Sequence, residues 1–172
     1  MISIDLLVNP FGDSRFLVED LRKLREDFVG DPFKSIFEEL ERRSISSENY
    51  LDRMLSLWCA RIDNLREIHL FFIVDIIFDE RKRPVQLNRL YEHTRKKLGT
   101  RFRSVYEATD TCNFIPQGVE ESIHIMAYGE ISDRCATLEA QALARKLREE
   151  GLQVSLELNY ALCPDKTDGK FE

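Results

Sequence analysis

The strongest chemical signal in the sequence is a run of positive charge from Arg81 to Arg103. Glu92 is the only acid within it, so the segment carries a net charge of +8. The whole chain carries −6, which leaves −14 for the remainder. Clustered cations of this kind bind phosphates, and such binding weakens as salt rises. The basic residues are Arg81, Lys82, Arg83, Arg89, Arg95, Lys96, Lys97, Arg101 and Arg103.

The basic segment also suits an intramolecular role. Arg89, His93 and Lys97 follow one another at a spacing of four residues, which places them on one helix face. The N-terminal third is rich in Asp and Glu, which could pair with that face. The overall negative charge argues against a protein that coats nucleic acid indiscriminately. The sequence therefore leaves two interpretations: a binding site for RNA or single-stranded DNA, and a docking face for the chain's own acidic helices.

Two histidines and two acids are the candidates for acid–base chemistry. His69 and His124 occupy matching positions in two similar stretches of sequence, and Asp75 and Glu130 follow them at similar distances. A neutral histidine beside a carboxylate can act as a general base. If the four side chains converge, they form a weak candidate for a catalytic site.

Metal and cofactor sites are not indicated. The four cysteines are widely spaced and include no Cys-x-x-Cys pair, which argues against structural zinc and favours reduced thiols. The seven glycines form no cluster, so no glycine-rich loop is available to hold a nucleotide phosphate. We therefore expect no metal and no cofactor. The cysteines are Cys59, Cys112, Cys135 and Cys163.

A repeated strand–helix–strand pattern must position these residues. The first copy opens at Ile68 and continues through a helix of about residues 85–98 to a strand of 101–109. The second opens at Ile123 and continues through a helix of 134–150 to a strand of 152–160, whose clean alternation indicates an edge or half-solvated strand. Two tandem units predict an α+β fold, a ferredoxin-like βαββαβ sandwich over about residues 67–160.

The N-terminal part is predicted to be a separate, mainly helical extension. After a short strand-like start, Ile2 to Val8, three amphipathic helical stripes follow as far as Leu65. We therefore divide the chain into an N-terminal helical extension packing on the sheet, residues 1–66, and a ferredoxin-like domain, residues 67–172.

A ferredoxin-like sheet leaves one face open, and this sequence would place apolar side chains at its centre. Such a centre with a polar rim is typical of an interaction surface. The N-terminal helices could cover it, or a second subunit could. The candidates for this interaction surface are Phe71, Ile73, Met126 and Tyr128.

The expected function is a non-catalytic binding or assembly protein, self-associating or part of a larger complex. Nucleic-acid binding through residues 81–103 is the first alternative, and a small enzyme on the open sheet face is the second. The longest apolar run, Leu70 to Val74, is too short to span a bilayer, and the start lacks a secretory signal. We therefore expect a cytoplasmic, reducing location, a protein partner and no membrane association.

Overall fold

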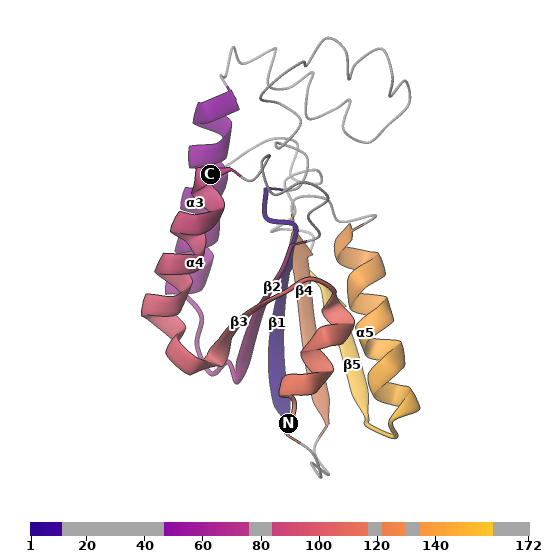
Figure 1. The fold of residues 1–172 in the computed structure, drawn as a ribbon. Helices are drawn as coiled ribbons and strands as arrows, with labels where there is room; N and C mark the ends of the chain where they lie inside the picture. The colour runs from indigo at the N-terminus through magenta and orange to yellow at the C-terminus, as the bar shows by residue number, and fades with distance from the viewer. Residues whose placement is uncertain (12–46, 76–83, 117–121, 130–134, 160–172) are drawn as a thin grey trace, which may run out of the picture.

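The structure is a computed structural model, and it describes residues 1–11, 47–75, 84–116, 122–129 and 135–159. Its centre is one five-stranded sheet in the order β3-β2-β1-β4-β5, in which every neighbouring pair is parallel (Figure 1). The strands are β1 (Ile2–Val8), β2 (Leu70–Val74), β3 (Phe102–Val105), β4 (Ile123–Gly129) and β5 (Val154–Leu158).

Helices cover both faces of the sheet. Helices α3 and α4 pack on one face, whereas η4 and α5 pack on the other (Figure 1). Parallel strands with helices on both sides and this strand order make a doubly wound, Rossmann-like α/β fold. The helical elements are α3 (Ser47–Asp63), α4 (Val85–Leu98), η3 (Gly99–Arg101), η4 (Ala108–Phe114) and α5 (Thr137–Glu149).

The prediction of a ferredoxin-like α+β sandwich is wrong, and β1 is the reason. Both strand–helix–strand units form, as β2–α4–β3 and β4–α5–β5, but they do not pair with each other. Instead β1 lies between them and pairs in parallel with β2 and β4. Six of its seven residues are buried, as a central strand covered on both faces requires. The sheet thus combines a strand from residues 1–66 with four from residues 67–172.

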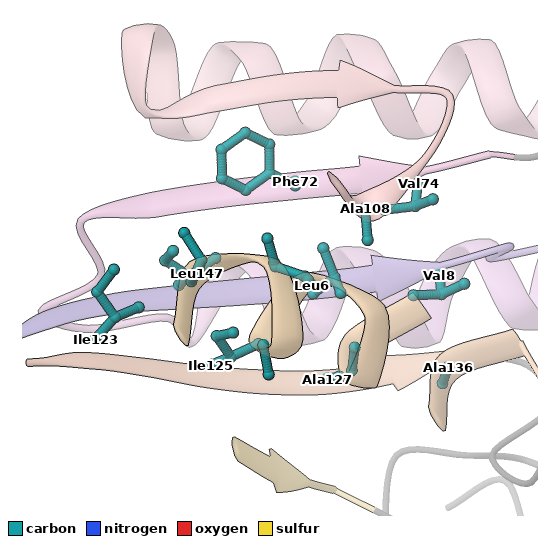
Figure 2. Close-up of a cluster of buried hydrophobic side chains, with 14 of the residues drawn as sticks. Leu6, Val8, Phe72, Val74, Ala108, Ile123, Ile125, Ala127, Ala136 and Leu147 are labelled. Carbon is teal, nitrogen blue, oxygen red and sulfur yellow. The ribbon is translucent and has the colours of Figure 1, made fainter. Parts of the chain in front are cut away.

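The face toward η4 and α5 is an apolar core (Figure 2). Alternate residues of the three central strands point into it, including Leu6, Phe72 and Ile125, all fully buried. Helix α5 contributes Ala140 and Ala144 where it meets the strands. These small side chains let the helix backbone lie close to the sheet.

The face toward α3 and α4 is built from larger side chains. Trp58 of α3 is fully buried, and its Nε1 donates to the carbonyl oxygen of Pro10 at 2.8 Å, which ties the segment after β1 to the helix. The predicted open face does not exist here, because a doubly wound sheet carries helices on both sides. Phe71, Ile73 and Tyr128 are fully buried in this core, and Met126 is partly buried against it.

Strands β1 and β4 come close at their carboxyl ends. Gly129 ends β4 beside Val8, and a Cβ atom at Gly129 would collide with the carbonyl oxygen of Val8. Asn9, the residue after β1, has a left-handed φ of 44°. The chain therefore leaves the middle of the sheet through a backbone conformation that few residues accept.

No helix among the described residues is long and apolar enough to cross a membrane.

Candidate functional site

The basic residues that the structure describes lie along one edge of the molecule, on α4, η3 and the edge strand β3. Helix α4 buries the stripe Gln86, Leu87, Leu90, Thr94 and Leu98, so its cations point away from the sheet. Arg89, Arg95, Lys96, Lys97, Arg101 and Arg103 are all exposed. Arg81, Lys82 and Arg83 lie outside the described residues.

Part of this charge is used inside the protein. His93 Nε2 lies 3.0 Å from Asp63 Oδ1 at the end of α3, and Lys97 Nζ lies 3.9 Å from the same oxygen. Gln86 of α4 donates to Asp52 of α3 at 3.0 Å. The side of α4 that faces α3 therefore contacts acidic groups of α3, whereas the acidic residues of 13–41 expected to pair with the basic segment lie outside the described residues.

Two other cations are held by main-chain carbonyls. Arg101 donates from Nε to the oxygen of Leu98 at 3.4 Å and from Nη1 to that of Ile68 at 3.3 Å. Arg103 donates from Nη1 to the oxygens of Thr100, at 2.9 Å, and Phe102, at 2.7 Å. A carbonyl positions a guanidinium but does not neutralise it, and further N–H donors of each arginine remain for a ligand.

Two arginines also lie over aromatic rings, one on each side of β3. The Arg95 guanidinium carbon is 6.0 Å from the centre of the Phe102 ring, and that of Arg103 is 5.6 Å from the Phe114 ring. These are cation–π contacts. Among the described residues, five cations along this edge have no carboxylate within 4.0 Å. We name them the basic edge: Arg89, Arg95, Lys96, Arg101 and Arg103.

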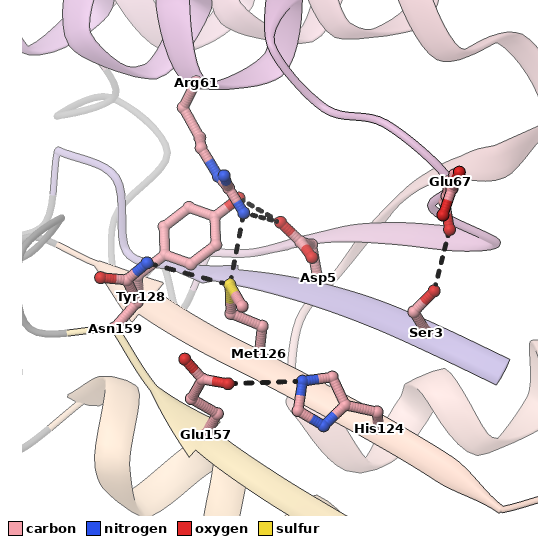
Figure 3. A network of polar contacts seen from close by, with 9 residues as sticks. All are labelled: Ser3, Asp5, Arg61, Glu67, His124, Met126, Tyr128, Glu157 and Asn159. Carbon is pink, nitrogen blue, oxygen red and sulfur yellow. Dashed lines mark hydrogen bonds and ion pairs between the residues drawn. The ribbon is translucent and has the colours of Figure 1, made fainter. Parts of the chain in front are cut away.

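A different set of polar groups is buried between α3 and the sheet (Figure 3). Asp5 of β1 accepts from the Tyr128 hydroxyl and from Arg61 Nη2, each at 2.9 Å. The Arg61 guanidinium carbon lies 5.3 Å from the Tyr128 ring centre, and Nη2 also reaches the sulfur of Met126 at 3.3 Å. These contacts join α3, β1 and β4 through one carboxylate.

Burial governs the titration of this cluster. It raises the pKa of Asp5 above its ordinary value of 3.8, although the Arg61 charge and the Tyr128 hydrogen bond act in the opposite direction. Burial, followed by the Asp5 charge, raises the pKa of Tyr128 well above 10.0. Burial acts to lower the pKa of Arg61, but its partners outweigh it and raise that pKa. Tyr128 therefore stays a phenol that donates to Asp5.

Sequence reasoning missed Asp5 and Arg61. A charged residue in the mainly apolar run Ile2–Val8 is the one signal that pointed to Asp5. Arg61 lies on α3 among ordinary amphipathic positions, and nothing in the sequence links it to a residue 56 positions away. Its side chain attaches α3 to the sheet, because it contacts residues of both β1 and β4.

The two candidate histidines lie in one row across the strands, on either side of Ser3. Neighbouring strands are about 4.8 Å apart, so the histidines are separated by about 10 Å, too far for proton transfer between them. His69 Nδ1 accepts from the Ser3 amide at 3.1 Å, which places the proton of a neutral ring on Nε2. His124 contacts Ser155 at 2.9 Å and Glu157 at 3.6 Å.

The candidate acids do not join these histidines. Asp75 follows the carboxyl end of β2, six residues beyond His69, which corresponds to about 20 Å along an extended chain. Glu130 lies outside the described residues. Ser3 Oγ lies 3.0 Å from His69 Nδ1 and 3.0 Å from the carbonyl oxygen of Glu67, so the histidine and that carbonyl compete for its one hydroxyl proton. The described residues therefore do not bring the predicted acid–base pairs together.

The cysteines Cys59, Cys112 and Cys135 are free thiols, and Cys163 lies outside the described residues. Burial raises the pKa of Cys59 and of Cys112, which keeps both protonated and weakly nucleophilic. Within the described ranges, no three His, Cys, Asp or Glu residues are grouped so that they could hold a metal ion.

The opposite edge of the molecule provides a contrast. A shallow hollow of about 420 Å³ lies between α5 and β5. Its lining includes Arg145 and Arg148, but also the carboxylate of Glu149. Arg148 donates to the carbonyl oxygen of Val154 at 2.9 Å. Cations there are mixed with an acid, whereas the basic edge lacks one apart from Glu92.

The chain matches no protein-family model, no curated protein and no solved structure. The arrangement of its own residues is therefore what bears on its function.

Proposed function

We propose that the basic edge binds the phosphate backbone of a nucleic acid. The observation that carries the proposal is a row of five exposed cations on α4, η3 and β3, none with a carboxylate partner among the described residues. Two of them, Arg101 and Arg103, are already oriented by main-chain carbonyls. Cations that are ordered but not neutralised lose little freedom when a phosphate binds.

The charge distribution of the whole chain supports an oriented complex. The remainder of the chain carries −14, so a polyanion would be repelled by most of the surface and attracted to the segment around the basic edge. Such a field favours one binding orientation over indiscriminate coating. The net charge of −6 is therefore compatible with a localised nucleic-acid site.

Among the described residues, the acidic groups of α3 engage residues of α4 other than these five, and the acidic residues of 13–41 lie outside the described part of the chain. The acidic groups that α3 presents to α4 engage Lys97, His93 and Gln86. Each of these contacts lies on the side of α4 that faces α3. None of the five residues of the basic edge takes part in these contacts, and Arg89 shares the helix face of His93 and Lys97.

The apolar surface expected from the sequence is not exposed for self-association. Phe71, Ile73 and Tyr128 are buried beneath the helices, so they cannot form an exposed apolar centre. Charges introduced at those positions would unfold the core before they could report on an interface.

Fluorescence anisotropy with labelled RNA and DNA oligonucleotides at about 50 and 200 mM salt tests the proposal. We expect binding that weakens steeply with salt. The double variant Arg95→Glu and Lys96→Glu should bind at least about tenfold more weakly at the lower salt, because two cations become anions. It should also show a shallower salt dependence. Lys97 is left unchanged because Asp63 contacts it.

The matched control is Arg145→Glu, which makes the same kind of charge change on an exposed face of α5. It should leave affinity nearly unchanged, and circular dichroism should show all variants folded. Absence of binding by the wild-type protein at both salt concentrations would overturn the proposal. Equal binding by the wild type and the double variant would also overturn it.

A further inference from the structure

We infer that the basic edge takes its nucleic acid as a single strand, with bases stacked on an aromatic platform beside β3. The platform consists of Phe114 with the Arg103 guanidinium over its ring, and Tyr106 is a second exposed ring directly after β3. This inference rests on the proposed function, and it adds the class of ligand and the residues that select it.

Exposed aromatic side chains occur where the cations are. Tyr106 is 50% exposed and Phe114 is 41% exposed, and they are the aromatics among the large exposed apolar side chains of the described residues. Tyr106 directly follows β3, and Phe114 ends η4. Helix α5 carries cations too, but its exposed apolar side chain is the aliphatic Leu138. The coincidence of rings and cations therefore distinguishes the β3 edge from the α5 surface.

Phe114 is held in place from the protein side. Its ring centre lies 5.9 Å from that of Phe72, which is fully buried. The Arg103 guanidinium lies 5.6 Å from the Phe114 ring centre, and two carbonyls fix that guanidinium in turn. A ring anchored in this way, and still 41% exposed, offers a stacking surface that needs little ordering when a base arrives.

Phosphate contacts lie within reach of the same platform. Arg101 ends η3 directly before β3, and Arg103 lies within β3. A single strand of nucleic acid whose bases stack on Phe114 would therefore have its backbone beside these cations. Alternation of aromatic surface and cation is how proteins bind single strands without reading their sequence. The guanidinium plane of an arginine also accepts a stacked base.

A duplex cannot use such a platform without unstacking. The faces of its bases are covered by neighbouring bases, and only its phosphates are available to the cations. We therefore expect single strands to bind more tightly than a duplex of the same sequence. For one stacked base, the difference is about tenfold.

The test compares single-stranded and duplex RNA and DNA by anisotropy for the wild type, Phe114→Leu and Tyr106→Ala. Leucine keeps the apolar contact with Phe72 but removes the ring. Each variant should lose about tenfold in single-strand affinity, while duplex affinity falls much less and the salt dependence stays the same. Leu138→Ala removes an exposed apolar side chain from α5 and is the matched control.

The outcomes separate the inference from the proposed function. Tight, salt-dependent binding that does not distinguish single strands from duplex would overturn the platform and leave the phosphate site intact. Equal losses for both ligands in the two ring variants would do the same. Absence of all binding would overturn both. If Phe114→Leu strongly lowers the melting temperature, its binding result reflects lost folding. The result for Tyr106→Ala then decides whether the inference holds, because no described buried ring contacts Tyr106.

Discussion

The two faces of the sheet hold their helices by different means. On the η4–α5 face the contact is apolar, and alanines of α5 lie directly against the strands (Figure 2). On the α3–α4 face larger side chains span the gap, and Arg61 of α3 reaches a buried carboxylate on β1 (Figure 3). One sheet thus holds its helices by close apolar packing on one face and by polar contacts on the other. The stability of the two contacts should respond differently to mutation.

The largest effect on stability is expected from Asp5→Ala on the α3–α4 face. It leaves the Arg61 charge and the Tyr128 hydroxyl without their shared acceptor, and loss of one partner from a buried pair costs about 3 kcal/mol of unfolding free energy. Asp5→Asn keeps an oxygen that can accept and should cost less. Urea denaturation measures both. Equal costs for the two variants would show that hydrogen bonding at Asp5 does not stabilise the fold.

The η4–α5 face should lose stability when side-chain volume is added to it. Ala144→Leu forces a larger side chain between α5 and the strands, where Ala144 is 1% exposed, and should cost about 2 kcal/mol. Gln141→Leu, at an exposed position of the same helix, is the matched control and should change stability little. Similar stabilities for the two variants would indicate that the α5 contact is not closely packed.

The smallest expected effect is a dependence of stability on pH that arises from Asp5 on the α3–α4 face. Because burial raises the pKa of Asp5 above 3.8, the folded state keeps that proton to a higher pH than the unfolded state does. Its contribution is fully present below the unfolded pKa and is lost as pH rises through the folded pKa. The stability of the wild type relative to Asp5→Asn should therefore fall as the pH rises from below 3.8 through the raised pKa of folded Asp5. A constant difference would contradict the shift.

Much of the local structure could be predicted from sequence. The units β2–α4–β3 and β4–α5–β5 lie near where the repeated pattern indicated, although the strand predicted over 101–109 ends at Val105 and η4 begins at Ala108. The clean alternation of β5 predicted an edge or half-solvated strand, and β5 lies at an edge of the sheet. Alternation assigns side chains to the two faces of a strand, but it does not give the direction of its neighbours. That is why the pattern of two units was compatible with both a ferredoxin-like and a parallel sheet.

The decisive clue to the fold lay in Ile2–Val8. One alternating set of this run, Ile2, Ile4, Leu6 and Val8, is wholly apolar, and the run ends in three consecutive apolar residues, Leu6 to Val8. Such a run suits a strand covered on both faces, yet we assigned it to a helical extension. The candidate site shows the same limit. Charge is visible in composition, so the basic edge could be found from sequence. The ring platform and the Asp5 cluster depend on contacts between residues far apart, and sequence patterns do not show these.

The central position of β1 has a consequence for how the protein forms. The Tyr128 hydroxyl and the Asp5 carboxylate that it meets are 123 residues apart in the chain. During synthesis β1 emerges long before β4, so until then this apolar strand has a neighbour on one side at most. Closing so long a loop is entropically costly, and sheets built from such distant pairings fold slowly. Strand β1, which lies at the centre of the finished sheet, is synthesised first and keeps an unpaired edge until β4 is made. Residues 2–8 are therefore the segment that most needs protection from aggregation during synthesis.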